Sequence, residues 1–235
     1  MTASPPAGPY GASGAMSFDD AYIGVPTWDI GRPQHEVLTL ADAGSFRSPV
    51  VDLGCGTGEN SLALAERGHD VVGIDASPRA VGKAMDKARA RGLDGAVFLV
   101  ADVFDVAGLG RRFGSALDCG LFHVLDDHER AVYAATVHAA LEPGGVLHML
   151  CFSDDEPPGW GPRRVTEGEL RATFTVGWRV REITPAVFET NLDAARARAW
   201  RAVFVRDEHE ARRAQSPEGI DAAPAVPMRR NPMRS

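Results

Sequence analysis

The chain has 235 residues, of which 44% are hydrophobic and 24% are charged, and its formal net charge is -7. This length suits one α/β domain with a full core, and the composition is that of a soluble globular protein. The acidic balance argues against nucleic acid as the main partner, because phosphate binding favours a basic face. No apolar run reaches the roughly 18–20 residues that span a bilayer.

The two ends of the chain differ in composition from its middle. Residues 1–16 are rich in Pro, Gly, Ala and Ser, lack charged side chains, and have none of the regions of a secretory signal, so we expect them to be disordered. Residues 207–235 are first charged and then Pro-rich, and we expect a flexible tail. We expect residues 17–206 to form a single domain, in which 17–45 is an N-terminal lid and helix segment.

Strand-like apolar runs alternate with helical patterns through the middle of the chain. A helix is expected over residues 33–43, after a loop over 18–32 that lies on the carboxyl edge of the sheet. The expected strands are 50–53, 71–74, 97–100, 116–120 and 146–152. The expected helices are 60–67, 78–91 and 128–141, with a short helical segment at 106–113. This alternation indicates a parallel sheet that is covered on both faces.

The regular alternation of strand and helix patterns ends after residue 152. A short helix is expected at 166–174, where Thr166 and Glu169 fit a capping box. Residues 178–183 and 199–205 have the pattern of strands, with only a loop at 185–196 between them. A hairpin there would add an antiparallel strand to the sheet.

The most informative stretch is VVDLGCGTGEN at residues 50–60. An apolar run that ends in Asp52 is followed by a turn with Gly54, Gly56 and Gly58, and then by the start of a helix. Glycines let the backbone approach a ligand closely, and a helix N-terminus offers unpaired N–H groups. Strand, glycine turn and helix in this order therefore predict a nucleotide-binding corner.

Acidic residues also follow the second and third strands. Asp75 lies roughly 20 residues beyond the glycines, where a carboxylate can accept hydrogen bonds from both ribose hydroxyls. Alternatively, Asp75 and Ser77 cap the helix that follows. Asp102 can accept the exocyclic amino proton of adenine, or it can be a loop residue.

The ordered set DLGCGTGEN, GID, AD, DCGLFH and LEPGG, over about residues 50–152, resembles the class I S-adenosylmethionine-dependent methyltransferases. The resemblance implies an α/β fold with a Rossmann-like, seven-stranded, mostly parallel sheet, a C-terminal antiparallel hairpin and helices on both faces. PTWDIGRPQ at 26–34, together with CFSD and GPRRVTEGEL, is similar to the thiopurine and thiol/halide methyltransferases. It is especially similar to actinobacterial relatives that methylate quinolone-type or quinone-type toxins.

The resemblance implies a cofactor site for S-adenosylmethionine. The residues that it places there are Trp28, Asp52, Gly54, Gly56, Asp75, Ala76, Asp102, Val103 and Gly120. Asp52, Gly54 and the Gly120 backbone would face the methionine end, and Asp75 would hold the ribose. Asp102 and the Val103 backbone would hold the adenine, while Trp28 would cover the cofactor. Thiol/halide enzymes often carry an aromatic residue where Cys119 and Gly120 stand, which argues against halide methylation.

His123 follows the fourth strand and is the candidate general base, because imidazole has the right pKa range. The alternative is a histidine that packs, or that bonds to a carboxylate such as Asp126 or Asp127. Arg163 and Arg164 could hold an anionic acceptor or stack on its ring. They could equally be a solvated pair that meets the acidic surface.

Aromatic residues in the flanking loops could line an apolar acceptor pocket, or could simply pack. These residues are Phe18, Tyr22, Phe152 and Trp160. Three scattered cysteines without C-x-x-C spacing indicate reduced thiols in a cytoplasmic protein. No base lies near Cys55 or Cys119 in sequence, and no cluster has metal-ligand spacing, so we expect neither a nucleophilic thiol nor a metal.

The predicted function is methyl transfer from S-adenosylmethionine to an O, N or S atom of a small aromatic or heterocyclic molecule. Quinolones, quinones, phenols and thiols are the acceptor types considered. One alternative is an NAD-dependent oxidoreductase, although the glycines run G-x-G-x-G rather than G-x-G-x-x-G. Another is a non-catalytic module that binds S-adenosylmethionine. We expect a monomer or a homodimer, with a small-molecule acceptor as partner and neither nucleic acid nor a membrane span.

Overall fold

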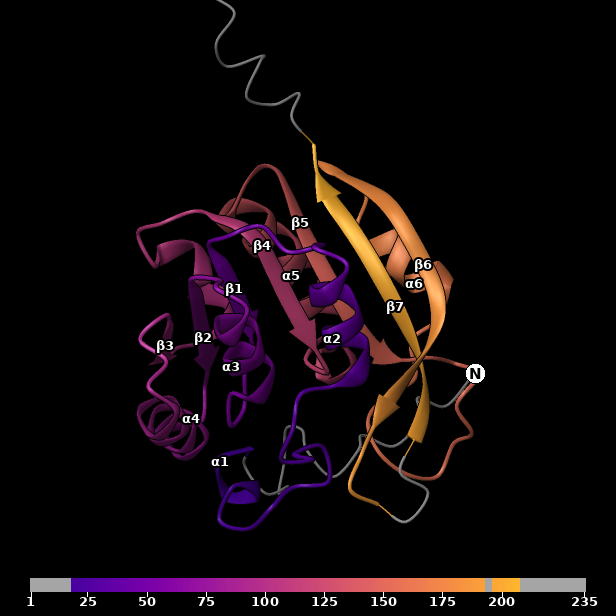
Figure 1. Cartoon of the computed structure of the whole chain (residues 1–235). Helices are drawn as coiled ribbons and strands as arrows, with labels where there is room; N and C mark the ends of the chain where they lie inside the picture. Colours follow the sequence, from indigo (N-terminus) through magenta and orange to yellow (C-terminus); the bar gives the residue numbers. More distant parts are fainter. Residues whose placement is uncertain (1–17, 193–195, 208–235) are drawn as a thin grey trace, which may run out of the picture.

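The computed structural model describes residues 18–192 and 196–207, which form a seven-stranded sheet (Figure 1). The strand order is β3-β2-β1-β4-β5-β7-β6. The strands are β1 Val50–Leu53, β2 Val71–Asp75, β3 Ala96–Val100, β4 Phe113–Cys119, β5 Leu141–Phe152, β6 Trp178–Glu189 and β7 Arg196–Arg206. The first five are parallel, and β7 is antiparallel to both of its neighbours. The predicted fold class is confirmed.

Helices cover both faces of the sheet. They are α1 Phe18–Ala21, α2 His35–Asp42, α3 Glu59–Glu66, α4 Pro78–Arg91, α5 Asp127–Ala140 and α6 Glu167–Thr173, with 3-10 helices η1 Val103–Gly108 and η2 Phe122–Val124. All four residues of β1 are buried, and successive side chains point to opposite faces. Val50 packs with residues of α2 and α3, whereas Val51 and Leu53 pack with residues of α5 and α6.

The C-terminal hairpin is longer than expected. The loop expected at 185–196 is wrong, because β6 continues to Glu189 and pairs with β7 as far as Arg196. Pro185 is tolerated within β6 because β6 is an edge strand, where a missing N–H breaks no ladder. Since β6 runs parallel to β5, this extension brings Phe188 and Glu189 to the carboxyl edge of the sheet.

The short helix expected at 106–113 is also wrong. The observed η1 ends at Gly108, and Phe113 is a fully buried residue at the start of β4. Gly110 interrupts this region with a φ of 73°. No full helix therefore packs over Val97 and Leu99 of β3, which stay 48% and 39% exposed.

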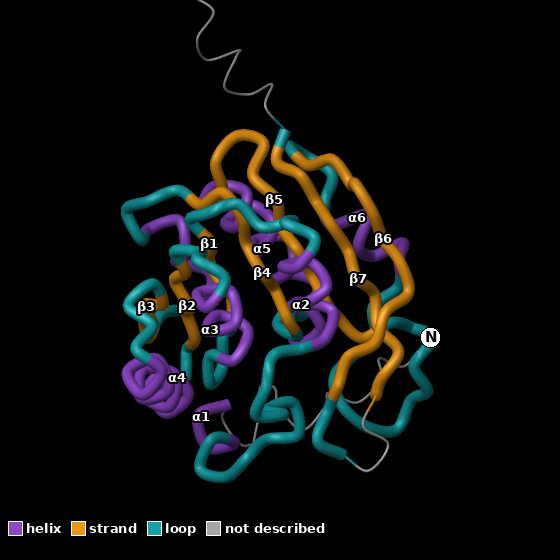
Figure 2. The backbone as a smooth tube through the Cα atoms, viewed as in Figure 1, coloured by secondary structure: helices purple, strands orange, loops and turns teal. Residues whose placement is uncertain are grey.

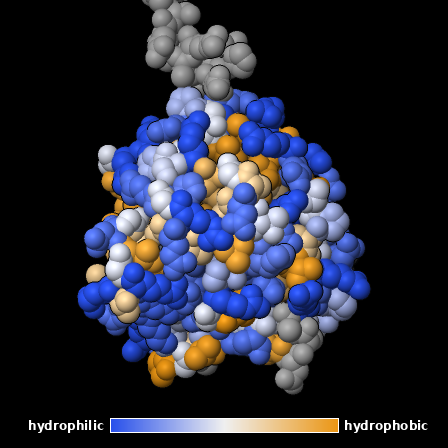
Figure 3. Space-filling view, viewed as in Figure 1, coloured by the Kyte–Doolittle hydropathy of each residue, from blue (hydrophilic) through white to orange (hydrophobic). Residues whose placement is uncertain are grey.

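The N-terminal segment lies at the carboxyl edge, as expected. α1 and the loop that leads to α2 lie beneath the end of the sheet toward which β4 points (Figures 1 and 2). The expectations for residues 1–16 and for the tail beyond Asp207 lie outside the described residues. On the face seen in Figure 3, hydrophobic residues are scattered among hydrophilic ones. Within the described ranges, no helix is long and apolar enough to cross a membrane.

Candidate active site

The glycine turn after β1 is closely packed on both sides. Gly54, Gly56 and Gly58 all have positive φ angles, of 68°, 54° and 84°. A Cβ atom on Gly56 would lie 2.8 Å from Tyr22 Oη, and one on Gly58 would lie 2.8 Å from the Cβ atom of Ala84. Both positions therefore require glycine, for space as well as for backbone conformation.

Asp75 ties this turn to the end of β2. One carboxylate oxygen accepts the Gly56 N–H and the other accepts the Ser77 N–H, each at 2.8 Å. Burial raises the pKa of Asp75, and these N–H groups act in the opposite direction. The N-cap of α4 is Ser77, whose Oγ accepts the Ala80 N–H, and the Asp19 carboxylate accepts the Arg79 N–H in the same turn. Asp75 therefore lies on the glycine turn, where the sequence predicts the ribose.

Asp52 and Asp118 lie on adjacent strands and point to opposite faces of the sheet. Asp52 is 1% exposed and accepts the Ser61 hydroxyl of α3 at 2.6 Å. Asp118 is fully buried and accepts the Tyr133 hydroxyl of α5 at 2.6 Å, together with the Leu121 N–H. Burial raises the pKa of Asp52 to about 7 and that of Asp118 to about 6. Asp118 thereby holds the loop after β4, a role that the sequence interpretation missed.

The residues expected near adenine, Asp102 and Val103, follow β3 at the same edge of the sheet. Asp102 is exposed, and its carboxylate accepts the Phe104 N–H at 3.0 Å as the N-cap of η1. The Ala101 N–H bonds to the Asp75 carbonyl oxygen at 3.1 Å, which brings the two loops together. Ala76 is exposed beside them, and Val103 is half-buried.

The N-terminal segment is anchored to α4 on one side of the site. The Asp19 carboxylate accepts the Ser77 hydroxyl at 2.6 Å and pairs with Arg79 at 2.8 Å. Lys83 Nζ donates to the carbonyl oxygens of Tyr22 and Gly24, at 2.8 and 3.1 Å. These contacts place the segment across the glycine turn.

The same segment is anchored to the end of β6 on the other side. The Gln34 side chain bonds to the N–H and carbonyl groups of Glu189, and Arg32 pairs with the Glu189 carboxylate. Asn191 donates to the carbonyl oxygens of Pro26 and Asp29. Gln34 and Glu189 are 155 positions apart, so no local pattern could have indicated these contacts.

Tyr22 and Trp28 lie over the glycine turn. Trp28 Nε1 donates to Tyr22 Oη at 3.0 Å, and Tyr22 is 5% exposed. Trp28 therefore lies where a cover for the cofactor is expected. Tyr22, predicted for the acceptor pocket, packs here against Gly56 and Trp28. Phe18 is 41% exposed and contacts Trp28 edge-on at 6.2 Å.

A group of rings that we call the aromatic cluster consists of His123, Phe152, Trp160 and Phe188. Phe152 is central, with ring centroids 5.0 Å from His123, 5.4 Å from Trp160 and 5.3 Å from Phe188. Trp28 packs against the hydrophobic group that contains Phe152 and Phe188, and it bonds to Tyr22 over the glycine turn. Sequence reasoning missed Phe188 because it lies in the segment expected to be a loop.

Gly120 joins the aromatic cluster to the end of β4. Its φ is 94°, and a Cβ atom there would lie 3.0 Å from the ring of Phe188 and 3.6 Å from Cε1 of His123. Its N–H donates to the Leu150 carbonyl oxygen at 2.9 Å. The site predicted for the methionine end and the rings therefore share one strand end.

His123 is buried and neutral. Its Nδ1 accepts the Phe152 N–H at 3.0 Å, and burial, with Arg130 and Arg164 nearby, lowers its pKa to about 3. A ring with so low a pKa is a poor proton acceptor at neutral pH, so this geometry disfavours the predicted general base.

The alternative of a bond from His123 to Asp126 or Asp127 is not observed either. The Asp126 carboxylate accepts the Glu129 N–H as the N-cap of α5. The Asp127 carboxylate accepts from the Arg163 guanidinium.

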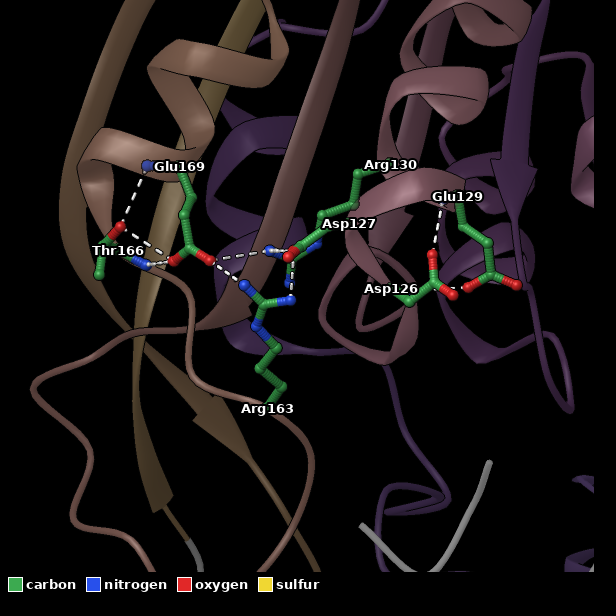
Figure 4. Close-up of polar contacts among 7 residues, drawn as sticks. All are labelled: Asp126, Asp127, Glu129, Arg130, Arg163, Thr166 and Glu169. Atoms are coloured by element: carbon green, nitrogen blue, oxygen red, sulfur yellow. Dashed lines mark hydrogen bonds and ion pairs between the residues drawn. The ribbon is translucent and has the colours of Figure 1, made fainter. Parts of the chain in front are cut away.

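Arg163 and Arg164 are neighbours in sequence but point to different places. The Arg163 guanidinium points at Asp127 and Glu169, beside the buried Arg130 (Figure 4). This arrangement matches the alternative in which Arg163 meets acidic groups, not the predicted acceptor contact. Arg164 instead lies over the rings of Phe152 and Trp160, 5.4 and 5.8 Å from their centroids.

Cysteine and metal chemistry receive no support from the described part of the chain. Burial raises the pKa of Cys55, Cys119 and Cys151, which disfavours the reactive thiolate. No three His, Cys, Asp or Glu residues among those described lie close enough to hold a metal ion.

Comparisons with known proteins agree with this geometry. A family model described as a methyltransferase domain matches residues 50–145. A 2-heptyl-1-hydroxyquinolin-4(1H)-one methyltransferase of Mycobacteroides abscessus is 40% identical over 170 residues, which cover 72% of this chain and 75% of that protein. A probable thiol methyltransferase of Arabidopsis thaliana is 29% identical over 62% of this chain and 65% of that protein.

A solved structure is also similar over most of the fold. It comes from a study of the conversion of a disulfide bond into a thioacetal group during echinomycin biosynthesis. It is 36% identical, has a TM-score of 0.76, and covers 84% of this chain and 95% of its own chain.

Proposed function

The chain belongs to the S-adenosylmethionine-dependent methyltransferases, and on that basis we propose that it methylates an O, N or S atom of a small aromatic or heterocyclic molecule. Quinolones, quinones, phenols and thiols are the acceptor types we propose. The observation that carries the proposal is the aromatic cluster, which lies beside Gly120 at the end of β4 and in the hydrophobic group that Trp28 packs against. We propose that a flat acceptor ring packs against this cluster beside the cofactor site.

The residues around the turn fit the cofactor. Two glycines leave no room for a Cβ atom, and the Asp75 carboxylate lies directly on the turn. We propose that Asp75 and Ala76 hold the ribose, and that Asp102 and the Val103 backbone hold the adenine. The residues proposed for the methionine end are Asp52, Gly54, Gly56 and Gly120, with Trp28 as the cover.

When bound, S-adenosylmethionine supplies a methyl group that is activated by the positive charge of its sulfur. The contribution of the chain is then alignment of the acceptor and exclusion of water, which can supply several kcal/mol of the barrier reduction. The N-terminal segment is suited to this role, since it lies across the turn and is anchored at α4 and at β6. The rings of Phe152 and Phe188 would hold the acceptor plane.

Relatives support an acceptor of this kind. One relative is named for a hydroxyquinolone, a flat heteroaromatic, and another as a probable thiol methyltransferase. We further propose that residues 17–206 act as a single domain, as a monomer or homodimer in the cytoplasm, without a nucleic-acid partner. A role in detoxification or secondary metabolism would suit such acceptors.

A methyl-transfer screen over quinolones, phenols, thiols and thiopurines tests the proposal, with S-adenosylhomocysteine release as the readout. Turnover of at least one ring acceptor is expected, with a raised KM for that acceptor in Phe188→Ala. Calorimetry with S-adenosylhomocysteine and with NAD checks the cofactor independently. Binding of NAD but not of S-adenosylhomocysteine would overturn the proposal in favour of the oxidoreductase, and cofactor binding with no turnover of any acceptor would favour the non-catalytic module.

A further inference from the structure

Arg164, beside the aromatic cluster, carries a positive charge that forms no ion pair with any described carboxylate. The three hydrogen bonds of the Arg164 guanidinium go to the carbonyl oxygens of Glu156, Pro157 and Pro162. Among the described residues, no carboxylate lies within ion-pair distance of Arg164. Arg163, its neighbour, is paired with two carboxylates. The guanidinium beside the rings is therefore bound by carbonyl dipoles, and the charge of the Glu156 carboxylate acts on it only from beyond ion-pair distance. An anionic ligand would complement it.

His123, in the same aromatic cluster, carries a hydrogen-bond donor as well. Because Nδ1 accepts the Phe152 N–H, the proton of the neutral ring resides on Nε2. In the described part of the chain, Nε2 has no hydrogen-bond partner, while His123 as a whole keeps 5% of its surface exposed. The ring is thus fixed in the tautomer that donates from Nε2.

The carboxylates near the rings already accept hydrogen bonds or form ion pairs. Glu156 accepts the backbone N–H of Arg198 at 2.7 Å, and Asp118 is turned toward α5, where it binds Tyr133. Glu189 is bound by Arg32.

The other titratable groups around the cluster are equally unsuited to proton removal. Arg130 on α5 is a buried cation, and Glu169 is bound to Arg130 and Arg163. Burial raises the pKa of the Cys119 and Cys151 thiols and of the Tyr22 hydroxyl, so all three stay protonated at neutral pH. The described residues therefore provide hydrogen-bond donors and positive charge at the rings, and each nearby carboxylate already accepts a hydrogen bond or forms an ion pair.

We propose, on the basis of the methyl-transfer function above, that the acceptor binds in the aromatic cluster as an anion, already ionised at the atom that is methylated. His123 Nε2–H and the Arg164 guanidinium stabilise this anion. In the reaction, a lone pair of the anion forms the bond to the methyl carbon. The carbon–sulfur bond breaks, and its electron pair stays on sulfur. Both products are neutral at the reacting atoms, and no proton moves.

The inference narrows the acceptors to rings whose reactive group ionises near neutral pH. N-hydroxy heterocycles, thiophenols and electron-poor phenols belong to this class. Aliphatic alcohols and aliphatic amines do not, because they would have to lose a proton inside the site.

Binding of 4-nitrophenol, whose anion is coloured, tests this without turnover. The protein is saturated with S-adenosylhomocysteine, and the midpoint of phenol ionisation is read from the spectrum, free and bound. Preferential binding of the anion lowers the bound midpoint by about one pH unit for each tenfold preference. A bound midpoint equal to or above the free value overturns the inference, as does failure of the anion to bind.

Variants of Arg164 and His123 test whether these two donors stabilise the anion. In Arg164→Gln the KM for an anionic acceptor is expected to rise about 10–100-fold, because a hydrogen bond to a charged group is lost. Arg163→Gln is the matched control, and its acceptor KM is expected to stay at the wild-type value. His123→Ala should lower kcat/KM about tenfold or more, and His123→Gln, which restores a donor but no basic nitrogen, should recover most of that loss.

The pH profile separates the inference from the proposed function. With several thiophenols, the inflection in kcat/KM should move with the ionisation of each thiol. An inflection at one fixed pH, lost in His123→Gln, would mean that His123 is a base and would overturn the inference while methyl transfer stands. If no acceptor is methylated, the proposed function fails, and the 4-nitrophenol measurement still decides which ionisation state the cluster binds.

Discussion

The side-chain amide of Gln34 bonds to both main-chain polar groups of Glu189. Nε2 donates to the carbonyl oxygen and Oε1 accepts the N–H, each at 2.8 Å. The Glu189 carboxylate accepts two hydrogen bonds from Arg32, at 2.9 and 3.0 Å, and one from the His35 N–H. The segment that covers the glycine turn and the strand end that carries Phe188 are therefore held together as one unit.

Gln34→Ala should destabilise the protein and loosen the cover. Gln34 is 4% exposed, so its loss leaves buried main-chain groups of Glu189 without partners, which costs about 1–3 kcal/mol of unfolding free energy. Urea denaturation measures this, and calorimetry should show weaker binding of S-adenosylhomocysteine. Arg89→Ala, which breaks an exposed pair with Asp86, is the control and should stay within about 0.5 kcal/mol of wild type. Equal stability of the two variants would contradict the role of Gln34.

Asp75→Asn should weaken cofactor binding. An amide has one accepting oxygen, so it cannot accept both the Gly56 and Ser77 N–H groups and also bind a ribose. The Kd for S-adenosylhomocysteine, measured by calorimetry, is expected to rise about 10–100-fold. Asp70→Asn, which alters an exposed ion pair with Arg111, should leave this Kd unchanged. An unchanged Kd in Asp75→Asn would remove Asp75 from the proposed site.

Asp52→Asn should change how stability depends on pH. The pKa of Asp52 is about 7 in the folded chain and has an ordinary value of 3.8, so between these pH values the folded state keeps a proton that the unfolded state has lost. Asp52 therefore lowers stability progressively as the pH rises from about 4 to about 7. The stability of Asp52→Asn relative to wild type should rise across this window, by up to about 4 kcal/mol, and then stay constant.

Denaturation of both proteins at several pH values measures this difference. The pKa values of His123 and His148 are lowered to about 3 and about 4, so these residues make the protein more stable as the pH rises, opposite to Asp52. They act equally in wild type and in Asp52→Asn, so their effects cancel in the difference. A difference that does not vary between pH 4 and pH 7 would show that Asp52 ionises normally in the folded chain.

Gly120→Ala should impair acceptor binding. The added Cβ atom would meet the ring of Phe188 at 3.0 Å, at a φ of 94° that side chains rarely adopt. We expect loss of stability of about 1–3 kcal/mol and a raised acceptor KM. Gly82→Ala is the matched control, because a Cβ atom there has nothing within 4 Å. Within helix α4 it should stabilise the protein by about 0.5–1 kcal/mol, as a thermal melt would show.

Glu169→Gln should reveal how far the ion pairs of Figure 4 stabilise the packing of α5 on α6. Glutamine can keep the capping box with Thr166, so the change isolates the loss of charge beside Arg130, which is 3% exposed. We expect destabilisation of about 2–4 kcal/mol, because Arg130 is buried while Glu169 is partly exposed. Glu167→Gln, which alters an exposed pair with Arg171, should cost at most about 0.5 kcal/mol. Similar values for the two would contradict the assignment.

Much of the fold was predictable because its signals are local. The strand at residues 50–53 and the helix at 78–91 have the predicted bounds, and the capping box of Thr166 with Glu169 is confirmed. The length of the β6–β7 hairpin was underestimated because a proline such as Pro185 argues against a strand. Pro185 is acceptable there only because β6 is an edge strand. Phe188 was missed for the same reason.

The sequence by itself determined the sheet, the glycine turn and the kind of cofactor, because periodicity, glycine conformation and strand-end acids act within a few residues of one another. Only the tertiary structure decided that Arg164 faces the rings while Arg163 meets Asp127 and Glu169. It also decided that His123 is a neutral donor and that Gln34 joins Glu189. These roles depend on burial and on partners that are distant in the chain, which no local pattern encodes.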